Sequence, residues 1–233
     1  MLPETLISIG EYAFANAKKL TLINFPYSLT TVGNGAFLSC TSLEYVNLKN
    51  TKINILSAQV FNSCNNLRSI ELPDGLITIK NSAFAYCISL EGIAFPENFE
   101  AIEEFVFGGY GKLKKVDFNS KLKSINHYAF YDCTSLSSIS LPSSLEQLGD
   151  VDRVDIFPDC TSLLNVEYLG TDPKAITSFG NVFGTSNPQN LYLPNVQDPA
   201  LAEVPPQDPN PWESFLGYDW ANKIQYETSM PSN

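Results

Sequence analysis

A phenylalanine recurs at nearly constant spacing along most of the chain, and this periodicity restricts the fold more than any other feature. It follows Ala, Val or Ile at Phe14, Phe37, Phe61, Phe84, Phe107, Phe130, Phe157 and Phe183. The intervals are 23 or 24 residues up to Phe130 and then 27 and 26. A unit this short cannot bury an apolar face by itself, so successive units must stack around one continuous core.

Each unit repeats the same order of apolar positions. The unit at Phe61 carries it without departure: Phe61, Cys64, Leu67, Ile70, Leu72, Pro73, Leu76 and Ile79, before Phe84 opens the next unit. Apolar and polar residues alternate toward Leu72, which predicts a short strand with one buried face that ends at the proline. We therefore predict a solenoid over residues 1–194, with about eight units of which the N-terminal one is incomplete.

The recurring Ala-Phe, Cys, Leu, Ile and Leu-Pro resemble the BspA-like, or Treponema-type, leucine-rich repeats, and the resemblance covers residues 1–194. It implies a right-handed coil with a parallel β-sheet on the concave side and short strands, turns and 3-10 segments on the other side. It also implies surface proteins of bacteria and anaerobic protists that act in adhesion and protein recognition. A fold alone does not determine function, so the implied role is the weaker inference.

The five cysteines occupy one place in the repeat, three residues after the phenylalanine. They are Cys40, Cys64, Cys87, Cys133 and Cys160, and the other units have Ala17, Tyr110 and Ser186 there. A residue that recurs at one position of stacked units forms a column in the core, where a free cysteine acts as a small hydrophobe. We therefore expect a structural column without disulfides, and the cysteines indicate nothing about the redox compartment.

The repeat stops after Pro194, and the composition changes twice. Residues 195–211 are rich in proline with acidic and amide side chains, which predicts a linker or extended loop. Residues 212–233 hold both tryptophans, Trp212 and Trp220, among several other aromatic residues. This segment has two possible roles, a cap that covers the open core of the last coil or a docking segment for another domain or protein.

The charge and hydropathy of the chain limit the classes of partner that it can bind. The 14 basic and 25 acidic residues give a formal charge of −11 over 233 residues, which disfavours nucleic acid and anionic membranes as partners. No apolar run is long enough to cross a membrane, so we expect no membrane insertion. The first residues lack the pattern of a signal peptide, and Leu2-Pro3 is the end of a strand, so we expect further repeats or domains before it in a parent chain.

No residue pattern indicates catalysis, and we expect neither an enzyme nor a cofactor. His127 is the single histidine, at a place held elsewhere by Glu11, Asn34 and Glu104, so we expect an exposed residue and no histidine-based catalysis. The run from Gly108 to Lys112 lacks the spacing of a phosphate-binding loop and places Tyr110 in the cysteine column. Paired carboxylates, Glu71 and Glu91, are the only weak support for a glycoside-cleaving or other enzyme.

One insertion interrupts the period. Leu148 and Phe157 are nine residues apart, where the earlier units have five, and the added residues bring Asp150, Asp152 and Asp155 together. Clustered carboxylates can hold calcium, but the complete pattern of a calcium loop is absent. We expect a solvated loop, with cation binding as the alternative.

The binding face is expected on the concave sheet, where residues between buried strand positions point outward. Three columns can be aligned from the register, and they are mixed in character and poor in aromatic residues, with Tyr45 beside Arg68 as the best pair for a hot spot. The candidate binding residues are Tyr45, Asn47, Arg68, Glu71, Glu91, Lys114, Lys115 and Asp117.

These observations favour a module that recognises an unidentified protein without doing chemistry. The leading hypothesis is adhesion to host or neighbouring cells, which requires a location on the cell surface or outside the cell. The alternative is a cytoplasmic or cytoskeletal scaffold in a protist. The absence of any Asn-x-Ser/Thr glycosylation site slightly favours this alternative.

Overall fold

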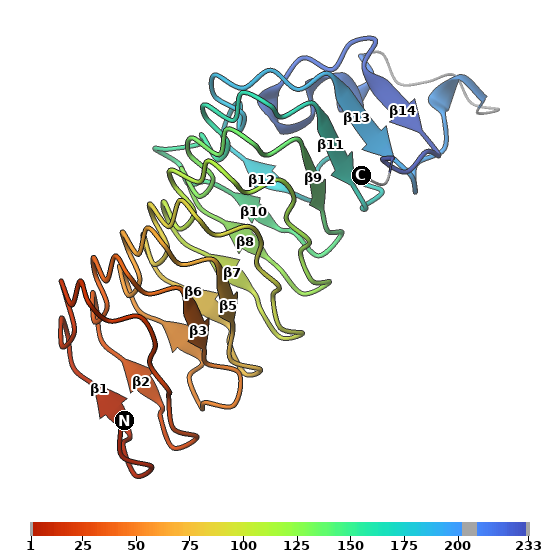
Figure 1. Cartoon of the computed structure of the whole chain (residues 1–233). Coiled ribbons are helices and arrows are strands. Elements are labelled where there is room, and N and C mark those ends of the chain that lie inside the picture. Colours follow the sequence, from red (N-terminus) through yellow and green to blue (C-terminus); the bar gives the residue numbers. More distant parts are fainter. Residues whose placement is uncertain (1, 202–208, 232–233) are drawn as a thin grey trace.

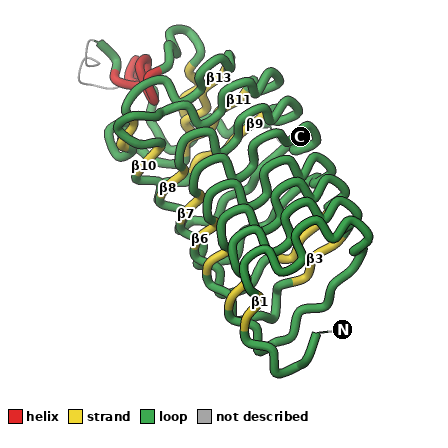
Figure 2. Tube along the Cα trace, turned by 90° about the vertical axis from the view of Figure 1, so that its left-hand side faces the viewer, coloured by secondary structure: helices red, strands yellow, loops and turns green. Residues whose placement is uncertain are grey.

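The computed structural model describes residues 2–201 and 209–231, and it is a parallel β-solenoid of about eight turns (Figure 1). Each turn is one unit of the repeat, and most of its residues lie in turns and bends between very short strands (Figure 2). The predicted fold class, a leucine-rich-repeat solenoid, is confirmed.

The first parallel sheet is built from the segment that precedes each Leu-Pro. Its strands are β3 (Tyr45–Asn47), β5 (Ser69–Glu71), β9 (Ser138–Leu141), β11 (Asn165–Tyr168), β13 (Asn190–Leu193) and β14 (Ile224–Tyr226). Single bridges join Asn24 to β3 and join Ala94 and Asp117 to β9, and the sheet is interrupted between β5 and Ala94. Residues of one column pair directly, as Asn47 does with Glu71 and Ser140 with Glu167, so the predicted outward columns have the correct register.

A second parallel ladder follows the Leu-x-x-Ile segment on another side of each coil. Its two-residue strands are β1 (Ser8–Ile9), β2 (Thr31–Val32), β4 (Ile55–Leu56), β6 (Thr78–Ile79), β7 (Ala101–Ile102), β8 (Ser124–Ile125), β10 (Gln147–Leu148) and β12 (Thr177–Ser178). In β4, β6, β7, β8 and β10 the second residue is fully buried and the first is polar or partly exposed, which is the period expected of a half-buried strand.

The residues around each phenylalanine of the repeat form a third hydrogen-bonded side, which we call the turn face. It spans from two residues before to two residues after each phenylalanine. The amides of Gly35, Phe37 and Ser39 donate to carbonyls of the next coil, at 2.9, 2.9 and 2.8 Å. Gly35 and Ser39 have φ of 57° and 59°, so left-handed residues flank the phenylalanine and turn every second amide outward along the solenoid axis.

The core is a column of stacked phenylalanines beside a column of thiols. Successive rings from Phe14 to Phe183 lie 5.1 to 6.0 Å apart at small interplanar angles. All five cysteines are free and buried, and each thiol donates to the phenylalanine carbonyl of the preceding coil, as Cys64 does to Phe37 at 3.2 Å. The hydroxyl of Ser186 makes the same bond to Phe157. The column therefore satisfies backbone carbonyls as well as filling space.

The chain after the last coil folds back over its end. Helix η1 (Pro199–Leu201) falls within the predicted linker, of which residues 202–208 lie outside the described part of the chain. Helix η2 (Pro211–Gly217) buries Trp212 and Phe215 against Tyr168, and Trp220 is fully buried against Phe183. Strand β14 then pairs in parallel with β13 and continues the first sheet.

Candidate functional site

The outer surface of the first sheet, which we call the strand face, brings together some of the predicted binding residues around β3 and β5. Tyr45 and Glu71 lie on adjacent coils, and the Tyr45 hydroxyl donates a hydrogen bond to the Glu71 carboxylate, not to Arg68. This bond to a carboxylate raises the pKa of the Tyr45 phenol above its ordinary value of 10. The ring of Tyr45 is therefore held in one orientation on an open surface, where it is available for contact.

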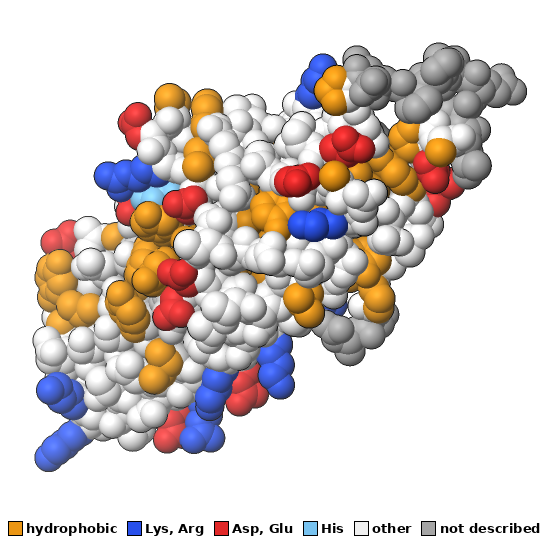
Figure 3. Space-filling model, turned by 90° about the horizontal axis from the view of Figure 1, so that it is seen from above, with side chains coloured by type: hydrophobic (Ala, Val, Ile, Leu, Met, Phe, Trp, Pro, Cys, Tyr) orange, Lys and Arg blue, Asp and Glu red, His pale blue; other side chains and the backbone are white. Residues whose placement is uncertain are grey.

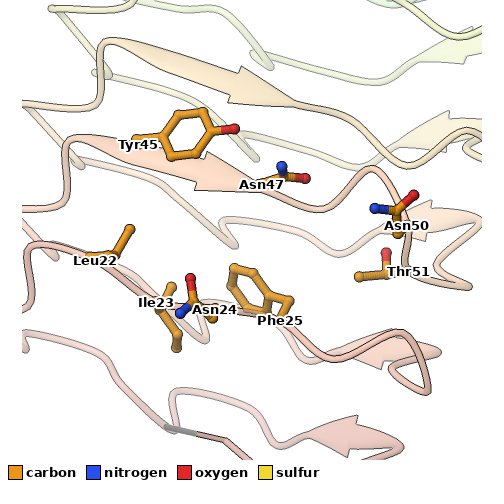
Figure 4. Close-up of a pocket in the computed structure, with 8 residues that line it drawn as sticks. All are labelled: Leu22, Ile23, Asn24, Phe25, Tyr45, Asn47, Asn50 and Thr51. Atoms are coloured by element: carbon orange, nitrogen blue, oxygen red, sulfur yellow. The ribbon is translucent and has the colours of Figure 1, made fainter. Parts of the chain in front are cut away.

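Two hollows flank this pair of strands. The first, about 190 Å³, lies between β3 and the coil before it and is lined by Leu22, Ile23, Asn24, Phe25, Tyr45, Asn47, Asn50 and Thr51 (Figure 4). The second, about 240 Å³, lies between β5 and the coil of Ala94, where the sheet is interrupted. Leu22 is 57% exposed at the edge of the first hollow. The face thus combines an apolar edge with amide and carboxylate groups.

The remaining predicted residues are dispersed along the solenoid. Lys115 and Asp117 form an exposed ion pair at 2.9 Å, two coils away from Glu71. Arg68 on the coil of Glu71, Glu91 on the next coil and Lys114 on the coil of Asp117 are exposed, and their backbones contribute to the hydrogen bonds between coils. An exposed ion pair such as Lys115 with Asp117 stabilises little, because both charges stay hydrated. Only Tyr45, Asn47 and Glu71 form a compact group.

The C-terminal segment covers the same face at the other end of the solenoid. Glu167, in the outward column, is only 9% exposed. Its carboxylate accepts hydrogen bonds from the Ser140 hydroxyl at 2.6 Å and from the Met230 amide at 2.9 Å. The strand face is therefore more open near β3 and β5 than near β11.

The expectation that His127 is exposed is wrong. The residue is only 3% exposed, and Nε2 lies 2.8 Å from Glu104 Oε1 and 3.2 Å from an Arg153 guanidinium nitrogen. Tyr128 packs against the imidazole, and Asp150 lies near its Nδ1. The reason is the insertion, which folds Asp150 and Arg153 over a position that is open in the regular coils.

The insertion is a closed turn in which Asp150 has a structural role. The backbone of Asp150 and that of Arg153 bond to each other, and Asp150 Oδ1 accepts the amides of Asp152 and Arg153 at 3.1 and 2.9 Å. Across the described ranges, 2–201 and 209–231, no group of three or more His, Cys, Asp or Glu side chains is arranged to hold a metal ion. The cation-binding alternative for Asp150, Asp152 and Asp155 therefore gains no geometric support.

The buried thiols are not suited to nucleophilic chemistry. Burial raises the pKa of Cys40, Cys64 and Cys133, and it raises that of Cys87 to about 12. Since the thiolate is the reactive form, these side chains are inert at neutral pH in the folded protein.

The turn face also carries an aromatic surface that was not predicted from the sequence. Tyr86, Phe105, Tyr131 and Tyr128 contact one another in that order, with ring centroids 5.8, 5.5 and 5.9 Å apart. We call this group the aromatic patch. A signal was present, because Phe105 and Tyr128 both lie two residues before the phenylalanine of their coil.

Comparison with known proteins agrees with this geometry. The stacked coils and the regular columns define a leucine-rich-repeat solenoid. The family model of the BspA-type leucine-rich-repeat region matches in six copies, over residues 1–109 and 54–184, and the chain belongs to this family. No protein of curated function matches the sequence.

Three solved structures are similar. A leucine-rich-repeat protein of T. pallidum is 30% identical with a TM-score of 0.55, over 73% of this chain and 75% of that one. A leucine-rich-repeat protein of Bacteroides ovatus is 25% identical with a TM-score of 0.51, over 80% of this chain and 58% of that one. The pneumococcal vaccine antigen PcpA shares the fold at 19% identity and a TM-score of 0.54, over 96% of this chain and 58% of that one.

A search for membrane-spanning helices over the described residues finds none long and apolar enough to cross a bilayer.

Proposed function

We propose that this chain is a non-enzymatic recognition module that binds a protein partner on the strand face at β3 and β5, and that it serves in adhesion at the cell surface. The observation that carries the binding site is the bonded pair of Tyr45 and Glu71, in which Tyr45 lines one hollow and Glu71 lines the other. Aromatic side chains held in one orientation are frequent anchors of protein interfaces, since they lose little entropy on binding.

The neighbours of Tyr45 suit an extended protein segment. Leu22 offers exposed apolar area, and Asn24 and Asn47 offer amide donors and acceptors in one outward column. Such a mixture of an apolar centre and a polar border is typical of protein interfaces. Family membership supports recognition of proteins in general, and the resemblance to surface proteins supports the adhesive role.

Location is the first test of this role. Antibodies against the protein are applied to intact and to permeabilised source cells. Labelling of intact cells is the expected result. Labelling that requires permeabilisation would contradict the adhesive role and favour the cytoplasmic or cytoskeletal scaffold.

The binding site has its own test. Beads coated with the purified protein are incubated with host or neighbouring cells, and attachment is counted. Tyr45→Ser introduces the residue that Ser69 supplies opposite Tyr45 on the next coil, so the fold tolerates it. Attachment should fall several-fold for Tyr45→Ser and for Leu22→Ser. Lys115→Ser, in the same column but two coils beyond Ser69, is the control and should attach like the unmodified protein.

A further inference from the structure

The aromatic patch is a concentration of large side chains on the outside of the solenoid. Tyr86 is 46% exposed and Tyr128 is 38% exposed, although both belong to a contiguous group of rings. Figure 3 shows hydrophobic side chains gathered beside the single histidine, His127, with acidic side chains close by. Tyr and Phe at this density are uncommon on a surface without a partner.

Glycines hold two of these rings against the surface. A Cβ added to Gly109 would lie 2.7 Å from the ring of Tyr86, and one added to Gly108 would lie 2.5 Å from the ring of Phe105. The rings therefore rest on bare backbone of the turn face and point along the solenoid surface. A surface ordered in this way before binding loses little conformational entropy when a partner arrives.

The repeat positions that hold these aromatic rings are occupied by aspartates on later coils. The column of Phe105 and Tyr128 has Asp155 on the following coil, and the column of Tyr86 has Asp132 and Asp159 beyond Gly109. Two cations of this region are engaged by other carboxylates, Lys80 by Glu103 at 2.5 Å and Arg153 by Glu104 at 3.6 Å. Within residues 2–201 and 209–231, Asp132, Asp155 and Asp159 form no ion pair, so their negative charge borders the patch.

We propose that the aromatic patch and its bordering aspartates form a second interaction surface, which binds an arginine-bearing segment of a protein partner. A guanidinium group stacks flat on an aromatic ring and pairs with a carboxylate through its N–H groups. Residues of both kinds are neighbours in the backbone here, because the Tyr128 amide donates to the Asp155 carbonyl and Tyr131 directly precedes Asp132. The chain's net charge of −11 adds a general attraction for a basic segment.

The chain supplies matched substitutions for the test. Tyr86→Ser copies Ser63, which occupies the same register with the same φ of 59°, and Tyr128→Gln copies Gln59, at φ 57° against 55°. Phe105→Ser likewise copies Ser82, at 57° in both. Tyr12→Gln removes a ring from the same column several coils away and serves as the control.

Binding is measured by titrating short peptides of alternating glycine with arginine, lysine or glutamate, while the ring signals of the tyrosines are followed by NMR. The arginine peptide should bind about fivefold more tightly than the lysine peptide, because stacking adds to charge. The glutamate peptide should not bind. The three patch variants should lose the preference for arginine, whereas Tyr12→Gln and Tyr45→Ser should keep it.

Four outcomes would overturn the proposal. The first is no shift of the Tyr86 or Tyr128 ring signals at about 1 mM arginine peptide, which corresponds to weak affinity. The second is equal binding of arginine and lysine peptides that the patch variants do not change, because net charge alone then explains it. The third is a response to a glucan oligosaccharide and not to the peptide. The fourth is concentration-dependent self-association that Tyr128→Gln abolishes.

These results are independent of the strand face. Loss of cell attachment in Tyr45→Ser with unchanged peptide binding, or the reverse, shows which of the two surfaces has failed.

Discussion

The indole of Trp220 meets the ring of Phe183 edge to face, with centroids 5.5 Å apart and planes at 89°. Phe183 is the last member of the phenylalanine column, and Trp220 is fully buried above it. Its Nε1–H donates to the Phe215 carbonyl at 2.8 Å, so the single polar group of the side chain is satisfied. The open end of the core is thus covered by a residue from outside the repeat.

Replacing this tryptophan should destabilise the whole solenoid. Trp220→Ala is expected to lower the free energy of unfolding by about 3–5 kcal/mol, because it leaves a large cavity and exposes the end of the column. Denaturant unfolding monitored by circular dichroism measures this, with the exposed Gln225→Ala of β14 as the control. Unchanged stability would contradict a capping role and favour docking to another domain.

The thiols predict a loss of stability in alkali. The pKa of Cys87 is about 12 when folded against 9.0 for an ordinary cysteine, so the unfolded chain releases this proton first. The stabilisation of the folded state by this protonated thiol is fully present below pH 9. It is lost as the pH rises toward 12, by about 1.4 kcal/mol per pH unit. Cys87→Ser retains a hydroxyl donor, as Ser186 does naturally. Its unfolding free energy should therefore decline less steeply between pH 9 and pH 11, and an identical slope would contradict this assignment.

The insertion should be removable. Residues 150–153 close on themselves through the bonds between Asp150 and Arg153, and their deletion restores the regular spacing of five between Leu148 and the phenylalanine. The protein should remain folded, and the His127 ring should become accessible. Reaction of the histidine with diethyl pyrocarbonate, monitored by absorbance, should be slow before the deletion and fast after it. Equal rates would show that the loop does not shield the ring.

Substitution by alanine should affect stability very differently at two nearby glycines, Gly109 and Gly111. Gly109 has a φ of 80°, and a Cβ there approaches the Tyr86 ring to 2.7 Å, whereas a Cβ on Gly111 meets nothing within 4 Å. Gly109→Ala should cost about 1–2 kcal/mol of stability, since a left-handed conformation disfavours a side chain and the ring must move. Gly111→Ala should stay within about 0.5 kcal/mol of the unmodified protein. Thermal unfolding of both variants decides this.

The repeat was predictable from sequence because burial and register in a solenoid follow one period. The strands at Ser69–Glu71 and Thr78–Ile79 and the buried column of Cys64 all depend on the same spacing, which the stacking of identical coils preserves. The outward position of Asn47 beside Glu71 follows from it too.

The features that were missed depend on departures from that period. His127 is buried by Arg153 from an inserted loop, and no register assigns the position of a loop residue. The aromatic patch joins Tyr86 from one column to Phe105 from another, so a reading of single columns does not reveal it. The hydrogen bond between Tyr45 and Glu71 depends on side-chain reach across one coil, which spacing alone does not define.

Hydrogen bonds from each coil to the next run along the turn face and along both sheets, and this has a mechanical consequence. A pull on the two ends of the solenoid would load these bonds one coil after another, so coils should detach singly and not all at once. A folded coil contributes about 5 Å along the axis. The same 23 residues, once released, span roughly 75–80 Å. The stack therefore holds a large extra length that a pulling force would release one coil at a time.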